Sequence, residues 1–246
     1  MPYVPLPHGR VHYAERGERR PGQPPVLFIH GAGAGSGIWS MTLARVARLA
    51  HAVAIDLPGH GPSDVGDAPL DLGRYRDATG LLAATLCLGP SVLVGHSMGA
   101  LVALEAALAW PDKVRALVLV AAAPRLPVDA ELLALLRSDP DAARVWLAEH
   151  GLSPRAKPAV RRGLLSAGPA APTDVTRTDF EIVRSTDLTA RLGTVRCPIT
   201  WLDGADDQIV PPASRGDRPG EIVVVPDAGH LLPIEAPAAI AAVLTR

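Results

Sequence analysis

The sequence predicts an α/β fold, in which a mostly parallel central sheet is flanked by helices and interrupted by an inserted helical cap. Two observations carry this prediction. Short apolar runs alternate with helical patterns up to residue 124 and again from residue 196, and strands that alternate with helices form parallel sheets. Residues 125–195 between them show helical patterns and no evident strand. We therefore expect one domain, with a core of residues 1–124 and 196–246 and a cap at 125–195.

The first half of the chain alternates strands and helices in a regular order. Residues 2–6 and 10–14 are typical of a short hairpin at the edge of a sheet. Compact apolar runs, typical of parallel strands, follow at 26–30, 52–55, 92–94 and 117–121. Helical patterns separate them at 41–49, 71–86 and 100–110.

The second half of the chain begins with helices alone. Helical patterns punctuated by prolines predict cap helices at 130–136, 141–150, 159–165 and 174–183. The alternation then returns with strands at 199–202 and 221–225 and a closing helix at 236–244. The stretch 212–220 leaves little room for a helix between the last two strands. Because the sheet continues on both sides of the insertion, we expect the cap to lie over its carboxyl edge, where ligands of open α/β sheets bind.

The overall composition points to a small-molecule partner. A net charge of -1, with 20% charged residues, gives no electrostatic basis for binding nucleic acid or a membrane surface. The N-terminus lacks a basic segment followed by an apolar one, and no apolar run approaches the roughly 20 residues that span a bilayer. We therefore expect a cytoplasmic protein without nucleic-acid or membrane partners, and neither a cofactor nor a metal. Cys87 and Cys197 are predicted to be buried free thiols.

A Gly-x-Ser-x-Gly pentapeptide at residues 95–99 stands where a predicted strand turns into a helix. Such a turn holds its central residue in a strained backbone conformation and exposes its side chain, while the glycines let strand and helix approach closely. The helix directs its unpaired N–H groups and its positive dipole end at the same point. Ser97 is therefore the candidate nucleophile, although the pentapeptide by itself also occurs in loops that carry no chemistry.

The order of residues along the chain identifies a base for this serine. A serine hydroxyl needs a base within hydrogen-bond distance, and an imidazole, with an ordinary pKa of about 6.5, suits that role. When the serine of such a strand-to-helix turn is the nucleophile (a nucleophile elbow), the acid and then the histidine follow it along the chain. Of the eight histidines, only His230 lies beyond the acidic residues at the end of the 199–202 strand, which are Asp203, Asp206 and Asp207. His230 is therefore the candidate base.

Four segments of the chain resemble motifs of the α/β-hydrolase superfamily, in the order of that family. They are HGAGAGSGIW at 30–39, DLPGHGPSD at 56–64, GHSMG at 95–99, and the pair GADDQIVPP at 204–212 with DAGHLLPIEAP at 227–237. The chain is similar to esterase-like members with a helical cap, among them carboxylesterases and the esterases that cleave methyl esters of carrier-bound pimeloyl chains. This resemblance implies an α/β-hydrolase fold and a catalytic triad of serine, aspartate and histidine.

The resemblance implies that Asp207 is the acid of the triad. In similar proteins the acid lies three positions after the glycine that closes the seventh strand and shortly before a Val-Pro pair, which matches Gly204 and Val210 here. Its carboxylate would fix the tautomer of His230 and stabilise the imidazolium. The neighbouring Asp206 remains the alternative, because adjacent acidic residues in a loop are easily misassigned by one position.

The resemblance also implies an oxyanion hole formed by the backbone amides of Ala32 and Met98. The segment 56–64 resembles a motif that braces the sheet edge, and we assign it no catalytic role. Substrate contacts are predicted for five side chains, which are His30, Trp39, Trp146, Phe180 and Leu231. Packing remains the alternative role of His30 and Trp39, and the core of the cap is the alternative for Trp146 and Phe180. His96 is expected to be a pocket-wall or packing residue.

The predicted function is hydrolysis of a carboxylic ester with a small to medium apolar acyl group, through an acyl-enzyme on Ser97. Hydrolysis of a lactone or of a carbon–carbon bond in a vinylogous diketone, and cofactor-free perhydrolysis, use similar machinery and stay open. The carbon–carbon reaction ranks lower, because those relatives usually have an aromatic residue where Leu231 follows His230. A ligand-binding receptor or scaffold without chemistry is the alternative from another class.

Basic residues cluster in the predicted cap at Arg155, Lys157, Arg161 and Arg162. By resemblance to the carrier-dependent esterases, this cluster is a candidate surface for an acidic acyl carrier protein. A solvated helix face is the alternative. The predicted partner is therefore a small-molecule ester, with an acyl carrier protein as a second candidate.

Overall fold

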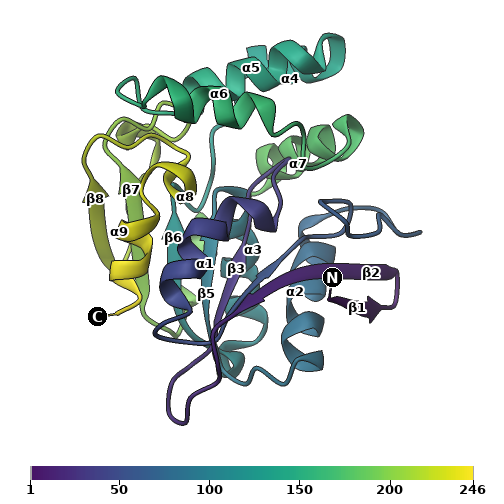
Figure 1. Cartoon of the computed structure of the whole chain (residues 1–246), viewed down its shortest axis with the longest axis vertical. Coiled ribbons are helices and arrows are strands. Elements are labelled where there is room, and N and C mark those ends of the chain that lie inside the picture. Colours follow the sequence, from purple (N-terminus) through teal and green to yellow (C-terminus); the bar gives the residue numbers. More distant parts are fainter. Residues whose placement is uncertain (1, 246) are drawn as a thin grey trace.

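The computed structural model describes residues 2–245 and centres on an eight-stranded sheet with strand order β1-β2-β4-β3-β5-β6-β7-β8 (Figure 1). The strands are β1 (Tyr3–Leu6), β2 (Gly9–Arg16), β3 (Val26–Ile29), β4 (Ala52–Ile55), β5 (Ser91–His96), β6 (Val114–Val120), β7 (Ile199–Gly204) and β8 (Glu221–Val225). β1 and β2 pair antiparallel at one edge, and every pair from β4 to β8 is parallel. The predicted α/β fold with a mostly parallel sheet is confirmed.

Helices cover both faces of this sheet. One apolar cluster includes side chains of α2 (Leu72–Thr85) and α3 (Met98–Ala109), and a second includes those of α1 (Ser40–Val46), α8 (Leu232–Glu235) and α9 (Pro237–Val243). Successive residues of β3 alternate between the two clusters, and all four of them are buried. A strand covered on both faces has to be apolar throughout, which is why the compact runs predicted these strands well.

The cap helices lie beyond the carboxyl ends of the strands (Figure 1). They are α4 (Ala130–Ser138), α5 (Pro140–Gly151), α6 (Pro158–Ser166) and α7 (Thr173–Ser185). Their own apolar cluster is small, because only Leu132, Leu136 and Ala143 are buried in it, and α6 has no buried residue. All four helical patterns are confirmed within about two residues. The division of the chain into core and cap domains stays a prediction.

The differences from the sequence prediction lie at turns and helix ends. The helix expected at 41–49 is preceded by a 3₁₀ turn, η1 (Ser36–Trp39), and ends at Val46. The closing helix begins at Pro237, and the sequence analysis missed α8 just before it. Between β7 and β8 the only helical turn is η4 (Pro212–Ser214), as the short stretch predicted.

Both cysteines are free thiols. Cys87 is exposed, so the prediction that it is buried was wrong; it lies just after α2 with a φ of 49°, in a turn that leads away from the helix. Cys197 is half-buried, and burial raises the pKa of its thiol. Among residues 2–245, no helix is long and apolar enough to cross a membrane.

Candidate active site

The turn between β5 and α3 holds Ser97 in a strained conformation. Its φ of 52° is a value that residues other than glycine rarely adopt. The flanking glycines permit the turn, since a Cβ at Gly95 would lie 2.3 Å from the carbonyl oxygen of Gly99. A Cβ at Gly99 would lie 2.3 Å from the carbonyl oxygen of Ile29. The strand, turn and helix that the pentapeptide predicted are therefore present, with Ser97 at the apex.

A histidine and an aspartate from two strand ends form a buried pair. Asp207 follows β7 and His230 follows β8, and His230 Nδ1 lies 3.1 Å from Asp207 Oδ2. The other carboxylate oxygen of Asp207 accepts hydrogen bonds from the amides of Ile209 at 2.9 Å and Val210 at 2.8 Å. With Nδ1–H donated to the carboxylate, Nε2 of His230 is the ring nitrogen that remains to accept a proton.

Asp207 retains its charge although it is buried. Burial by itself raises the pKa of this carboxyl group. The adjacent His230, the hydrogen bonds from that ring and from the Val210 amide, and the Arg215 guanidinium outweigh burial and lower the pKa below its ordinary value. An ionised carboxylate in this position orients the imidazole and stabilises its protonated form.

Two buried arginines, which the sequence analysis did not single out, brace the same strand ends. Arg215 lies 3.2 Å from Asp203 and 3.9 Å from Asp207, and Arg218 donates to Asp203 at 2.6 Å. Arg218 also packs over the ring of Trp201, 4.8 Å from its centroid. These arginines lie in a loop rich in proline and glycine, where no periodic pattern indicates burial. An arginine in such a loop is ordinarily exposed to solvent. The sequence therefore contained no usable signal for them.

The alternative acid, Asp206, faces the cap instead of His230. It accepts hydrogen bonds from the Ser153 hydroxyl at 2.7 Å and from Arg155 at 3.0 Å. Arg155 also donates to Asp227 at 2.7 Å. Asp207 is thus the carboxylate that contacts His230, and Asp206 is the one that contacts the cap. Arg155, predicted to belong to the basic cluster, is already paired with two carboxylates of the core.

A cavity of about 780 Å³ lies between the strand ends and the cap. Core residues that line it include Ser97, His230, His96 and Ala32, and cap residues include Leu136, Leu147, Leu164 and Phe180. Its surface is mainly apolar, as expected of a pocket for an organic ligand. The cavity therefore contains the candidate nucleophile and the candidate base together.

The link between Ser97 and His230 is open in this structure. Within the described residues, no hydrogen bond joins the Ser97 hydroxyl to the imidazole, whereas the link between His230 and Asp207 is formed. Such links are often long or poorly aligned in ligand-free enzymes and tighten when substrate binds. The structure brings Ser97 and His230 to one cavity and pairs Asp207 with His230, and the catalytic roles of the three residues stay predictions.

The two predicted oxyanion donors lie next to the candidate nucleophile. Met98 is the first residue of α3, so its amide has no partner within the helix. Ala32 lines the cavity, and its amide donates to no acceptor among the described residues. The loop that carries Ala32 approaches the serine closely, since a Cβ at Gly31 would lie 3.2 Å from Ser97 Cβ. Both amides are therefore free to bind a ligand at this point.

The structure brings only two of the five predicted substrate-contact residues to the cavity. Phe180 and Leu231 line it. His30, Trp39 and Trp146 do not belong to the lining, and those three predictions need correction. In each case packing, the alternative role, explains the position of the side chain.

His30 and Trp39 lie in the core beneath the cavity, and both are fully buried. The ring of Trp39 packs against that of Phe28, with 5.1 Å between the centroids. His30 Nδ1 lies 2.9 Å from the carbonyl oxygen of Gly31, and its Nε2 accepts a hydrogen bond from the Leu57 amide at 3.0 Å. Neither side chain can reach a ligand from these positions.

Trp146 packs in the apolar cluster of the cap and does not line the cavity. Its indole N–H donates to Glu131 at 3.2 Å, and its ring stacks on His150 with 3.9 Å between the centroids. A tryptophan at helical spacing in a thin cap packs against neighbouring helices, and sequence alone does not reveal which face is turned to the ligand.

His96, expected to be a wall or packing residue, lines the cavity and supports His230. Its Nε2 lies 2.9 Å from the backbone carbonyl oxygen of His230, and the two rings have centroids 5.0 Å apart. Burial, followed by the adjacent His230, lowers the pKa of His96 to about 3. A neutral His96 therefore donates its Nε2–H to this carbonyl and holds the loop of His230 in place.

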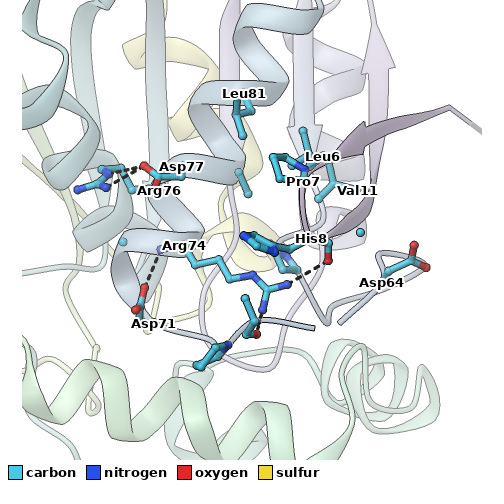
Figure 2. A pocket seen from close by; sticks show the side chains of 16 residues that line it. Leu6, Pro7, His8, Val11, Asp64, Asp71, Arg74, Arg76, Asp77 and Leu81 are labelled. Carbon is cyan, nitrogen blue, oxygen red and sulfur yellow. Dashed lines mark hydrogen bonds and ion pairs between the residues drawn. The ribbon is translucent and has the colours of Figure 1, made fainter. Parts of the chain in front are cut away.

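A second cavity, of about 500 Å³, lies near the β1–β2 hairpin and α2, away from these residues (Figure 2). Arg74 reaches across it, but its guanidinium already donates to the backbone carbonyls of His8, Val65 and Ala68. The arginine fastens a loop to the hairpin and offers no free charge to a ligand, so this cavity is not a candidate active site.

Residues 26–243 match the model of a family described as the alpha/beta hydrolase family. The chain belongs to this family. It is 33% identical to a pimeloyl-[acyl-carrier protein] methyl ester esterase from Methylococcus capsulatus over 203 residues, which cover 76% of this chain and 78% of that protein. Several other curated relatives align over only 38 to 41% of their own length.

Solved structures show the same fold. A thermophilic esterase from Thermogutta terrifontis superposes with a TM-score of 0.87 at 23% identity, covering 100% of this chain and 97% of that one. A protein described as an N-acyl homoserine lactone degrading enzyme superposes with a TM-score of 0.86 at 22% identity, covering 99% of both chains. The resemblance drawn from the sequence motifs is thus confirmed at the level of fold and family.

Proposed function

We propose that the protein is a serine hydrolase that cleaves carboxylic esters of small to medium apolar acyl groups. The observation that carries this proposal is that His230, paired with the buried Asp207, lines the same cavity as Ser97, which stands on a strained turn. The esterases among the relatives and the fold neighbours support it.

In the proposed reaction each of these groups has a part. Ser97 Oγ attacks the ester carbonyl carbon while His230 Nε2 takes the hydroxyl proton, and the amides of Ala32 and Met98 donate to the oxyanion that forms. The imidazolium, stabilised by Asp207, then protonates the departing alcohol, which leaves an acyl-enzyme on Ser97. Water activated by the same histidine attacks this ester and releases the acid. Each oxyanion donor typically contributes on the order of 100 to 1000-fold to turnover.

The cavity supports an apolar acyl group of limited size. About 780 Å³ lies in the range of pockets for small organic ligands, and the apolar part of the lining comes mainly from the cap. Arg144 is the only lysine or arginine among the lining residues; it already donates to the Leu165 carbonyl and lies 3.7 Å from Asp141. We therefore assign the acyl group to the apolar surface and not to a charge contact.

Lactone hydrolysis is the second candidate function. A lactone is a cyclic ester, so the same attack by Ser97 opens the ring, and the fold neighbour described as a lactone degrading enzyme favours this reaction. Carbon–carbon bond hydrolysis ranks below it, because Leu231 occupies the position after His230. A receptor without chemistry has no need of the Asp207–His230 pair.

An acyl carrier protein is a further candidate partner. The relative described as a pimeloyl-[acyl-carrier protein] methyl ester esterase supports it, together with three basic side chains on and before α6. Lys157 and Arg162 are exposed and Arg161 is half-buried, whereas Arg155 is paired with Asp206 and Asp227. The proposed carrier surface therefore consists of Lys157, Arg161 and Arg162.

The test is a chain-length series of p-nitrophenyl esters with wild type and Ser97→Ala, and a set of lactones assayed in parallel. We expect preference for short to medium chains and a loss of roughly 10⁴-fold or more in kcat for the variant. Lactone turnover that exceeds ester turnover would make the protein a lactonase. Undiminished turnover by Ser97→Ala would refute the proposed function.

A further inference from the structure

Asp179, a buried carboxyl group on cap helix α7, forms hydrogen bonds with three separate parts of the core. Asp179 is fully buried. Its Oδ2 lies 2.7 Å from His60 Nε2 and accepts a hydrogen bond from the Gly33 amide at 2.9 Å, while Oδ1 accepts from the Tyr75 hydroxyl at 2.6 Å. Burial and the charge of Asp179 raise the pKa of Tyr75, so this phenol remains a donor. A fully buried carboxyl group with three hydrogen-bond partners in the core is not a surface contact of the cap.

One of these bonds reaches the loop that faces Ser97. Gly33 directly follows Ala32, and α7 packs against it so closely that a Cβ at Gly33 would lie 2.7 Å from Thr176 Cγ2. The amide of Gly33 belongs to the peptide unit on the carboxyl side of Ala32. Asp179 therefore fixes the plane of that peptide unit from within the cap.

The peptide unit on the amino side of Ala32 is fixed from the core. His30 Nδ1 lies 2.9 Å from the Gly31 carbonyl oxygen, which also accepts from the Ala34 amide at 3.2 Å. Burial, followed by the neighbouring His60, lowers the pKa of His30 well below its ordinary value, so this ring is neutral and donates through Nδ1. Because a peptide is planar and trans, holding the Gly31 carbonyl also sets the direction of the Ala32 N–H.

We infer that Asp179 is a positioning residue for the oxyanion hole, acting from the cap through the Gly33 amide on the adjacent amide of Ala32. The inference rests on the proposed function, in which the Ala32 amide donates to the oxyanion. His60 and Tyr75 hold the carboxylate in place, and His30 holds the other peptide unit. A donor that is fixed before the reaction stabilises a developing charge without reorganising at that moment, and a small misplacement weakens it.

The test compares Asp179→Ala and Asp179→Asn with Asp174→Asn, which changes an exposed carboxylate on the same helix. Each variant is assayed with a p-nitrophenyl ester, with a trifluoromethyl ketone that forms an oxyanion on the serine, and with the product carboxylate as inhibitor. For Asp179→Ala we expect kcat to fall by about 10 to 100-fold with KM changed by less than about threefold. The inhibition constant of the ketone should rise in parallel, and that of the carboxylate should stay constant.

Melting temperatures accompany each measurement. If Asp179→Ala does not fold, the isosteric Asp179→Asn carries the test, with the same pattern and a smaller loss. A folded variant whose kcat stays within about twofold of wild type would overturn the inference, and so would a fall in kcat with no change in ketone inhibition. If Ser97→Ala is inactive and the Asp179 variants are as active as wild type, only this inference is wrong. If Ser97→Ala is fully active, the proposed function itself is wrong.

Discussion

The two sides of the cavity are built differently. On the acid–base side, Asp207 and His230 stand at the ends of neighbouring core strands and are held by core groups, among them the amide of Val210 and the guanidinium of Arg215. On the oxyanion side, the loop around Ala32 depends on the cap as well, because Asp179 of α7 accepts from the next amide. In the proposed mechanism the core thus holds the proton relay, whereas core and cap share the site at which charge develops.

The difference follows from how each part is stabilised. The core buries two large apolar clusters, and α7 joins the first of them through Ile182 and Val183. The other cap helices have a small cluster of their own, and the cap adds a few directional polar contacts to the core. Besides Asp179, these include the Ser153 amide to Glu235 at 2.8 Å and Arg155 to Asp206. Polar contacts of this kind add a fixed geometry to apolar packing, which is not directional.

The largest effect is expected at the acid. Asp207→Asn should lower kcat by roughly 10⁴-fold, because the amide favours the wrong imidazole tautomer and does not stabilise the imidazolium. Asp206→Asn is the matched control one position away; it weakens only contacts to the cap, and its kcat should stay within about tenfold of wild type. Steady-state kinetics on one ester compares the two variants. A larger loss of kcat for Asp206→Asn than for Asp207→Asn would mean that Asp206 is the acid of the triad. The proposed difference between the two carboxylates would then be wrong.

The second prediction concerns His96 in the core, whose titration should make the free energy of unfolding depend on pH. The pKa of folded His96 is lowered to about 3, and an unfolded imidazole titrates near 6.5. Between these values the unfolded chain binds a proton that the folded chain does not, so the free energy of unfolding falls as pH decreases below about 6.5. One such group contributes about 1.4 kcal/mol per pH unit across this window.

The measurement is urea unfolding between pH 7 and pH 4.5 for wild type and His96→Gln. Glutamine keeps a donor for the His230 carbonyl and removes the titrating group, so the variant should lose stability less steeply as pH falls. Equal slopes for the two proteins would show that His96 is protonated in the folded state and does not support the His230 loop as a neutral donor.

The smallest effect is expected at the outer surface of the cap. The double variant Lys157→Glu/Arg162→Glu should leave p-nitrophenyl ester turnover unchanged and lower kcat/KM for a carrier-linked ester by about tenfold at low salt, with the difference disappearing at high salt. Arg196→Glu, before the first residue of β7 at the opposite end of the strands, is the control. A loss that is the same for both substrates, or that salt does not change, would rule out electrostatic recruitment.

The sequence predicted the parts of the molecule that depend on regular apolar patterns and on chain order. β3 and β4 are buried on both faces, so their composition alone identified them. Ser97 and His230 were found from the turn motif and from the order constraint, and both line the cavity. These signals are local or depend on order along the chain, which explains why they were available before the structure.

The remaining parts depend on contacts between residues far apart in the chain. Asp179 meets Gly33 across 146 positions, and Arg215 lies within reach of Asp203 only because a short loop turns back into the core. Trp39 was predicted to contact substrate, with packing as the alternative, and its ring fills the core beneath the cavity. No periodicity marks a polar contact between an insertion and its host domain, so such contacts need the folded structure.

The central claim is that Ser97 becomes a nucleophile through His230 and Asp207. The most direct measurement is labelling with a fluorophosphonate, followed by peptide mass mapping of wild type and His230→Ala. We expect one adduct per chain, located on Ser97 in the wild type, and labelling slower by at least about 1000-fold in His230→Ala. Absence of an adduct on Ser97, or an undiminished labelling rate without the histidine, would contradict the account.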